Sequence, residues 1–190
     1  MDQSSVLSTF RQSGALLEGH FRLTSGLHSV GYLQSALVLQ NPPLAEALGR
    51  ALAERIRDLR PTVVLSPALG GLIIGHEVAA ALDLPFRFSE RQDGRMVLRR
   101  GFEITTGERV AIVEDVVTTG RSTNEAAAAV RERGGEVVAV GAVIDRTGGS
   151  NPFVVAFEAL TALTIDTWSA EDCPLCRGGS EPEKPGSRES

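Results

Sequence analysis

Lysine, cysteine and long apolar runs are scarce in this sequence. Lys184 is the only lysine, and 24 acidic residues outweigh 19 basic ones, which gives a formal net charge of -5. A negative chain argues against nucleic acid or an anionic membrane as the main partner. No apolar run approaches the roughly 20 residues of a membrane-spanning helix, and the start, MDQSSVLSTFRQSG, lacks the pattern of a signal peptide. We therefore expect a cytoplasmic protein.

The two cysteines, Cys173 and Cys176, form one CPLC motif near the C-terminus. A structural zinc site usually needs four ligands. The three histidines, His20, His28 and His76, all lie far upstream. The sequence therefore predicts no metal bound by protein side chains, and it leaves the role of the CPLC motif open.

Apolar segments of two kinds alternate along the chain and predict the fold. At 190 residues one domain with a sizeable core is expected, because folding buries roughly 70% of the surface at this length. Helices are predicted at 42–59, 72–84 and 122–132, and strands at 62–66, 109–113, 137–144 and 154–165, the last at an edge. This alternation indicates an α/β fold whose mostly parallel central sheet has helices on both faces. We assign residues 1–176 to the domain and predict that the polar segment 177–190 is disordered.

The stretch VAIVEDVVTTGRST, residues 110–123, places polar side chains where α/β sheets bind ligands, beyond the carboxyl ends of their strands. Neighbouring carboxylates at Glu114 and Asp115 repel each other unless something engages them, and the hydroxyls of a cis-diol would do so. Taken alone, such a pair is more often two solvated acids. The hydroxyls, arginine and glycine of residues 118–123 begin a helix, where free N–H groups favour a phosphate. N-capping by Ser122 or Thr123 is the alternative, although it explains only one hydroxyl.

Other phosphate and nucleophile motifs do not fit. A Walker loop that ended at Gly120-Arg121-Ser122 would need its first glycine at Asp115 and a lysine at Arg121. The segment GGLIIG, residues 70–75, lacks the GxGxxG spacing, and the chain has no GxSxG sequence. Hydride transfer and serine hydrolysis are therefore disfavoured.

The segment VAIVEDVVTTG resembles the signature of type I phosphoribosyltransferases, which use phosphoribosyl pyrophosphate (PRPP). The resemblance implies that fold, with a small N-terminal hood formed by about residues 1–40. It also implies that Glu114 and Asp115 hold the ribose hydroxyls and that the loop 118–122 holds the 5-phosphate. PALGG resembles the family's pyrophosphate loop, although a plain strand-to-helix turn is an equal reading of the bare sequence. The implied PRPP-binding set is Ala68, Leu69, Gly70, Gly71, Glu114, Asp115, Val116, Val117, Thr118, Thr119, Gly120, Arg121 and Ser122.

Two more stretches, residues 14–34 and 142–149, are similar to orotate phosphoribosyltransferases, so the likeness covers about residues 14–150. It implies that Arg146 grips orotate with Thr118 beside it. Orotate is an anion whose carboxylate suits the planar fork of an arginine, whereas Arg146 taken alone is more often a surface ion-pair partner. The implied reaction is Mg²⁺-dependent transfer from PRPP to orotate, which yields orotidine 5-monophosphate.

The segment 87–100 holds five arginines against two acids, a local charge of 5 - 2 = +3. By resemblance it is a mobile loop that closes over pyrophosphate and reaches the partner subunit of a homodimer. It lacks the lysines and histidine common there, and Thr24 replaces an expected lysine in the N-terminal segment. Arg91 is the nearest match to a catalytic loop lysine, and the roles of Arg87, Arg95, Arg99 and Arg100 stay open. Because arginine remains protonated, no general acid can be named.

Two alternatives remain. A purine or uracil phosphoribosyltransferase would differ in whether its base pocket contains Arg146. A PRPP-sensing regulator that binds nucleic acid would need a basic face or an added module.

Overall fold

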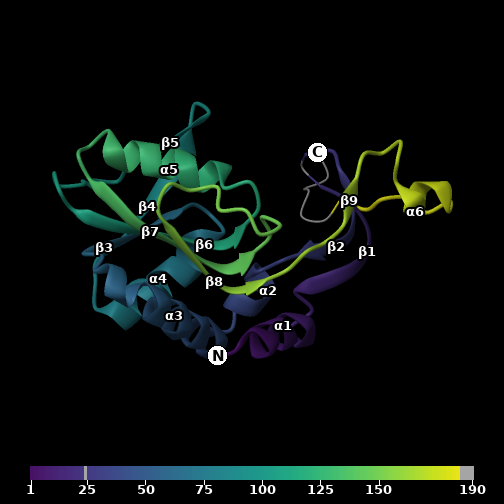
Figure 1. Cartoon of the computed structure of the whole chain (residues 1–190), viewed down its shortest axis with the longest axis horizontal. Coiled ribbons are helices and arrows are strands. Elements are labelled where there is room, and N and C mark those ends of the chain that lie inside the picture. The colour runs from purple at the N-terminus through teal and green to yellow at the C-terminus, as the bar shows by residue number, and fades with distance from the viewer. Residues whose placement is uncertain (24, 185–190) are drawn as a thin grey trace.

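The computed structural model describes residues 1–23 and 25–184, and it has two parts (Figure 1). A six-stranded sheet of order β5-β4-β3-β6-β7-β8 forms the main body, and a three-stranded sheet of order β1-β2-β9 forms a hood beside it. Every neighbouring pair in the main sheet is parallel except β4 and β5. Its strands are β3 (Val63–Pro67), β4 (Phe86–Gln92), β5 (Arg95–Leu98), β6 (Arg109–Val117), β7 (Glu136–Asp145) and β8 (Ala156–Ala162). The predicted α/β class is confirmed, and the late strand β8 lies at an edge.

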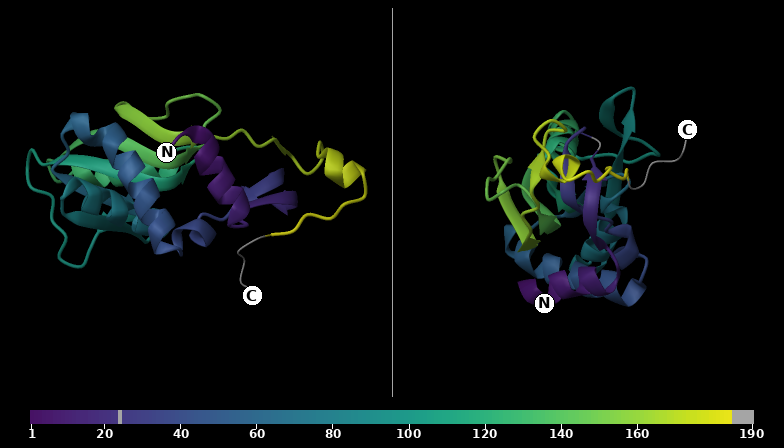
Figure 2. Two further views of the ribbon diagram at one scale, coloured as in Figure 1. Left: turned by 90° about the horizontal axis from the view of Figure 1, so that it is seen from below. Right: turned by 90° about the vertical axis from the view of Figure 1, so that its right-hand side faces the viewer.

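Alternating side chains of the central strands face two helical layers. Val64, Ala111 and Val113 belong to a core shared with α1 (Gln3–Gln12), α2 (Ala36–Leu39), α3 (Pro42–Ile56) and α4 (Gly71–Leu82). Val63, Leu65 and Ile112 pack on the opposite face with α5 (Arg121–Arg131). Because strand side chains alternate with a period of two, a strand buried on both faces is apolar throughout. Figure 2 shows the helical layer of α1 and α3 from below.

Helix α3 shows how local signals and burial combine. The Asn41 side chain accepts a hydrogen bond from the N–H of Leu44, and Pro42 and Pro43 occupy the first positions of the helix, which need no N–H partner. Leu48, Leu52 and Ile56 are fully buried against the sheet, and each contributes about 1.5 to 3 kcal/mol by leaving water. The predicted helix 42–59 is observed, with its last turn, Arg57–Leu59, as a 3-10 helix.

The structure differs from the prediction in two segments near the expected site. Strand β6 extends to Val117, four residues beyond Val113, because Val116 and Val117 continue the pairing with β7. Most of the predicted loop 87–100 is the hairpin of β4 and β5. Its turn is Asp93-Gly94, with φ of 49° and 80°. Two positive φ values are typical of the hairpin turn that Asp-Gly favours, so the sequence did contain this signal.

The hood joins the N-terminal hairpin to the C-terminal segment. It contains β1 (Leu16–Arg22), β2 (His28–Leu33), β9 (Thr167–Trp168) and the short helix α6 (Pro174–Arg177). The N–H of Arg22 donates to the carbonyl of Glu183 at 2.7 Å, and the N–H of Glu183 donates to the carbonyl of His20 at 2.8 Å. The expectation of disorder after residue 176 therefore differs from the structure over 177–184. Residues 185–190 and Thr24 lie outside the described residues, so the expectations for them stay predictions.

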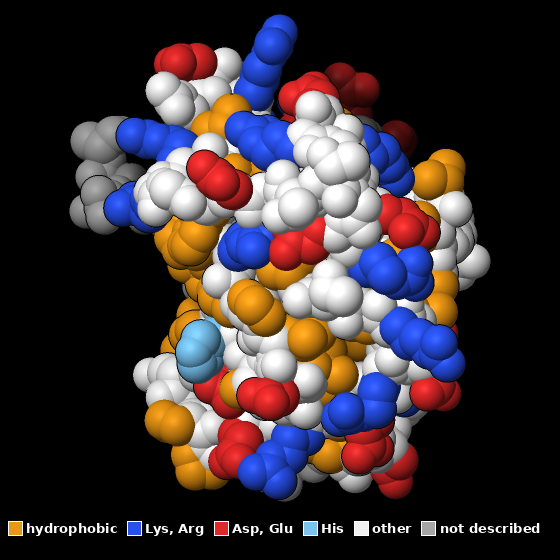
Figure 3. Space-filling view, turned by 90° about the vertical axis from the view of Figure 1, so that its left-hand side faces the viewer, with side chains coloured by type: hydrophobic (Ala, Val, Ile, Leu, Met, Phe, Trp, Pro, Cys, Tyr) orange, Lys and Arg blue, Asp and Glu red, His pale blue; other side chains and the backbone are white. Residues whose placement is uncertain are grey.

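Figure 3 shows that basic side chains (Lys and Arg) and acidic side chains (Asp and Glu) are interspersed over one face of the molecule. Ion pairs such as Arg50 with Glu46 and Arg100 with Glu90 show this pairing of opposite charges. Within residues 1–23 and 25–184, no helix is both long enough and apolar enough to cross a membrane.

Candidate functional site

Two predicted parts of the site meet at the carboxyl ends of β3 and β6. Glu114 is only 8% exposed, and both it and Asp115 lie against the turn Gly70-Gly71 that begins α4. A Cβ atom on Gly70 would stand 2.7 Å from Oδ1 of Asp115, and one on Gly71 would stand 2.7 Å from the carbonyl oxygen of Val113. Only glycine permits this approach without displacing backbone or carboxylate. Segments that are more than 40 residues apart in sequence thus form one wall of the site.

The acid pair Glu114 and Asp115 has raised pKa values. Burial raises the pKa of Glu114 to about 8, and the neighbouring Asp115 carboxylate adds to the effect. Burial also raises the pKa of Asp115, while the N–H of Val116, which donates to its Oδ1 at 2.9 Å, lowers it. In the described part of the chain no arginine, lysine or histidine forms an ion pair with either carboxylate. Buried acids without a cation are a feature of functional sites, since they reduce stability until a ligand engages them.

The loop between β6 and α5 has the geometry of an anion site. Gly120 is the N-cap of α5 with φ of 70°, and no side chain caps the helix. N-capping by Ser122 or Thr123, the alternative that the sequence left open, is therefore wrong. The first N–H groups of an uncapped helix lack intrahelical partners and carry the positive end of the helix dipole. A cavity of about 80 Å³ lies here, lined by Glu114, Val116, Val117, Thr118, Thr119, Gly120, Arg121, Ser122 and Thr123.

Arg91 belongs to an ionic network that includes Glu125 and Arg121 of α5. Its guanidinium forms an ion pair with Glu125 of α5, and it donates to the carbonyl of Gly94 at 2.7 Å. Glu125 also accepts from Nε of Arg121 at 2.9 Å. Glu125 thus holds Arg91, the predicted catalytic residue, and Arg121, a predicted phosphate-loop residue. Glu125 was not among the predicted site residues, although its position four residues after Arg121 on a helix is a signal for an ion pair.

Other arginines of the 87–100 segment have partners of their own. Arg87 donates to Glu108 at 2.6 Å, and Arg100 forms two hydrogen bonds of 2.8 Å to Glu90. The first contact joins β4 to the residue before β6, and the second joins the end of the hairpin to β4. Arg87 and Arg100 therefore have carboxylate partners outside α5, whereas Arg91 shares Glu125 with Arg121 of the phosphate loop.

Arg146 follows β7 at the same edge of the sheet. Its N–H donates to the carbonyl of Val117 at 2.8 Å, and Val117 is opposite Asp145 in the strand pairing, so Thr118 and Arg146 are the next residues of adjacent strand ends. The side chain is half-buried, and burial lowers the pKa of its guanidinium. Among the residues that the structure describes, no carboxylate forms an ion pair with it. The simple surface ion pair is thus not observed, and the cation remains available for an anionic ligand.

A parallel sheet with buried acids beside an uncapped helix fits a phosphate-binding protein, and comparison with known proteins identifies the class. Residues 35–155 match the phosphoribosyl transferase domain. The chain therefore belongs to the phosphoribosyltransferase family. Similar relatives include the orotate phosphoribosyltransferases of Pelotomaculum thermopropionicum, 48% identical, and of Caldanaerobacter subterraneus, 47% identical, each over 188 residues and 99% of both chains. The family prediction is confirmed.

Solved structures lead to the same family. The Mycobacterium tuberculosis orotate phosphoribosyltransferase in complex with PRPP is 26% identical, with a TM-score of 0.69 over 86% of this chain and 97% of that chain. The same enzyme in complex with inorganic phosphate gives a TM-score of 0.70 over 85% of this chain and 96% of that chain.

Proposed function

We propose that this protein transfers the 5-phosphoribosyl group of PRPP to orotate and releases pyrophosphate, a step of pyrimidine biosynthesis. The observation that carries the proposal is the buried pair Glu114 and Asp115, which has no cationic partner within residues 1–23 and 25–184 and adjoins an uncapped helix. The orotate phosphoribosyltransferases related over the full length of the chain support the choice of substrate.

We assign the ribose hydroxyls to the acid pair. An ionised carboxylate that accepts a hydroxyl hydrogen bond contributes about 1.5 to 3 kcal/mol. The amides and hydroxyls of residues 118–122 then hold the 5-phosphate, and the backbone of residues 68–71 faces the pyrophosphate. This division places sugar, phosphate and pyrophosphate along the carboxyl ends of β6 and β3, where ligands bind in open α/β sheets.

Magnesium fits this site, since the carboxylates of Glu114 and Asp115 face no competing protein cation among the described residues, and Mg²⁺ prefers phosphate and water oxygens over an all-protein cage. We infer that oxygens of the bound substrate hold it, while the two carboxylates engage the ribose hydroxyls. When bound, Mg²⁺ supplies positive charge that stabilises the pyrophosphate.

The transfer depends more on how the protein positions the reactants than on a covalent bond between protein and substrate. The bond from orotate nitrogen to the ribose carbon forms as the bond to pyrophosphate oxygen breaks. The nitrogen releases its proton to solvent, and the departing group gains negative charge. The protein aligns the reactants and compensates that charge. Arg146 orients the carboxylate of orotate, with Thr118 beside it, and Arg91 stabilises the pyrophosphate. Because Arg91 is held by Glu125 in this structure, its participation requires that this ion pair opens, a local motion of the hairpin.

We further infer a homodimer in which the hairpin serves the partner's site. The hairpin lies at the edge of the sheet, and its Arg91 contacts α5 instead of the acid pair. Mixing the impaired variants Arg91→Ala and Asp115→Asn tests this arrangement. Recovery of activity in the mixture is expected from exchange, and the absence of recovery from a proven mixed dimer would contradict it.

An assay with PRPP, Mg²⁺ and a panel of bases tests the proposed function. Orotate should be consumed with release of pyrophosphate, while adenine, guanine and uracil remain. Consumption of another base instead of orotate would establish the purine or uracil alternative. Binding of PRPP and nucleic acid without turnover of any base would establish the regulator.

A further inference from the structure

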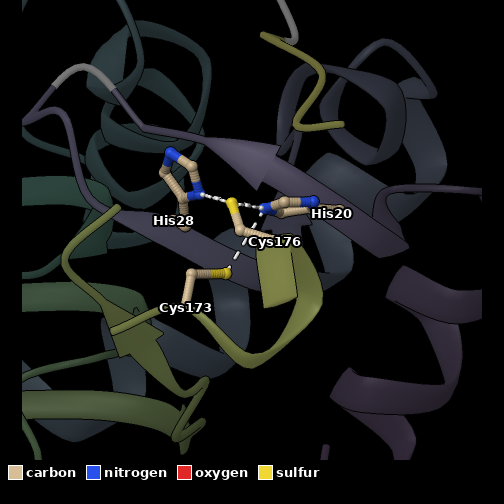
Figure 4. A group of neighbouring side chains, drawn as sticks. All are labelled: His20, His28, Cys173 and Cys176. Carbon is tan, nitrogen blue, oxygen red and sulfur yellow. Dashed lines mark hydrogen bonds between the residues drawn. The ribbon is translucent and has the colours of Figure 1, made fainter. Parts of the chain in front are cut away.

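Four potential metal ligands meet in the hood, away from the acid pair. His20 lies on β1 and His28 on β2, while Cys173 and Cys176 come from the C-terminal segment around α6. The strand pairing of β2 with β9 and the return of the chain through Glu183 bring these distant segments together. Figure 4 shows the four side chains directed toward one another. The expectation that the histidines lie too far upstream of the CPLC motif is therefore wrong for His20 and His28, and it holds only for His76, which is not part of the group.

The distances between the ligand atoms fit one small ion. Nε2 of His20 lies 3.0 Å from Nδ1 of His28 and 3.4 Å from Sγ of Cys173. Sγ of Cys176 lies 3.2 Å from Nδ1 of His28 and 3.8 Å from Nε2 of His20. All four atoms lie within 4.8 Å of one another. In a tetrahedral zinc site with its usual bond lengths, neighbouring ligand atoms are about 3.3 to 3.8 Å apart. The group is therefore close to the size of such a site.

Hydrogen bonding alone gives a poor account of this group. Nε2 of His20 faces another ring nitrogen and two sulfur atoms, whereas one ring N–H or lone pair satisfies a single good partner. The other nitrogen of the ring, Nδ1, lies 3.2 Å from the hydroxyl of Ser180. A metal-bound histidine typically uses its second nitrogen in this way, and the contact fixes the ring orientation that presents Nε2 to an ion.

Burial separates this group from an ordinary surface cluster. His20 is 7% exposed, His28 5% and Cys173 0%, while Cys176 is half-buried. Yet the hood has little apolar core of its own: neither hydrophobic cluster of the described chain contains a buried residue from 16–33 or 164–184. Small units without a core are commonly stabilised by a metal or a disulfide. The hood thus has both a ligand set and a structural need for an ion.

We propose that His20, His28, Cys173 and Cys176 form a structural zinc site that joins the C-terminal segment to the hood hairpin. Two thiolates and two imidazoles suit Zn²⁺, while Mg²⁺ and Ca²⁺ prefer oxygen ligands. Four protein ligands complete the tetrahedron and leave no position for a reactive water, so the role is structural. The site lies in a different part of the fold from the proposed PRPP site, and the inference does not depend on the proposed reaction.

Metal analysis of the full-length protein tests the site. Protein purified under reducing conditions, with any affinity tag removed, should retain about one zinc per chain after dialysis against a weak chelator. Substitution by Co²⁺ should give the ligand-field absorption of a tetrahedral ion together with thiolate charge-transfer bands. Absence of zinc, combined with no uptake of stoichiometric Zn²⁺ by the reduced protein, would overturn the proposal. A Cys173–Cys176 disulfide in protein isolated from cells with thiols trapped would also overturn it.

Variants assign the ligands. Cys176→Ser and His28→Asn should each lose at least tenfold in zinc affinity. His76→Ala is the matched control and should retain zinc, because His76 is exposed and lies outside the group. Equal loss of zinc in the control, or full retention in Cys176→Ser, would contradict the assignment.

Hydrogen exchange tests the site in the wild-type protein, so the result does not depend on whether a variant folds. Removal of zinc from the wild-type protein by a strong chelator should speed exchange in residues 16–33 and 167–184, and leave β3, β6 and β7 protected. Unchanged exchange in the hood after zinc removal would show that the ion does not hold these segments together.

Discussion

Replacement of Glu114 by Gln is expected to stabilise the ligand-free protein at pH 8 while it weakens PRPP binding. Glu114 is buried, and its pKa is raised from about 4.5 to about 8 by burial and by Asp115. The folded state therefore binds a proton more tightly than the unfolded state. For a group of this kind, the contribution to stability is complete below about pH 4.5 and is lost as the pH rises through the folded-state pKa.

The magnitude follows from the two pKa values. A tenfold change in proton affinity corresponds to about 1.4 kcal/mol, so this group alone lowers the free energy of unfolding by roughly 3 to 4 kcal/mol between pH 5 and pH 8. Glutamine keeps the shape of the side chain without titrating. The difference in stability between Glu114→Gln and wild type should therefore grow by roughly that amount over the same range. The same substitution removes an ionised acceptor for the ribose hydroxyls, so stability and binding should change in opposite directions.

Denaturant unfolding of both proteins at several pH values, with the ligand absent, measures the effect. Glu103→Gln is a matched control, because it makes the same chemical change at an exposed position. Titration calorimetry with Mg²⁺ and PRPP tests the predicted change in binding. The affinity of the wild type for PRPP should rise from pH 6 to pH 8 more steeply than that of the variant. If the free energy of unfolding changed with pH by the same amount in wild type and Glu114→Gln, the proposed pKa of buried Glu114 would be refuted.

Three further substitutions test the other assigned roles. Asp115→Asn should weaken PRPP binding by about 10- to 100-fold, as expected for the loss of a charge-assisted hydrogen bond, and an unchanged Kd in calorimetry would contradict its role. Arg146→Ala should raise KM for orotate at least tenfold while the Kd for PRPP stays constant, and equal weakening of both would place Arg146 outside the base pocket. Arg91→Ala should lower kcat at least tenfold with little change in Tm, since an exposed ion pair such as Arg91 with Glu125 contributes only about 0 to 1 kcal/mol; wild-type turnover would exclude it from the reaction.

Much of the fold could be predicted because its determinants are local. Apolar residues at steps of four, with prolines at the start, predicted α3, and β-branched runs predicted the central strands. The end of β6 was placed four residues too early because acids usually mark the end of a strand. Pairing of Val116 with Ile144 continues the ladder past them, and neither this pairing nor the burial of Glu114 has a local signal.

The parts of the site that lie at the carboxyl ends of the parallel strands could be predicted, because the order and direction of the strands place them there. Parallel strands end at one edge, so the loops that begin at Ala68 and Thr118 and the side chain of Arg146 were expected to approach one another. The contact of Arg91 with Glu125 depends on how a hairpin folds onto α5, and no sequence pattern specifies it. The same is true of His28 and Cys176, which are 148 residues apart and meet only because the chain returns to the hood.

A structure of the protein with Mg²⁺ and PRPP bound tests the central claim most directly. The ribose hydroxyls should lie about 3 Å from the carboxylates of Glu114 and Asp115, with the 5-phosphate against the amides of residues 118–122. A sugar bound elsewhere, with this acid pair left without a ligand, would contradict the account.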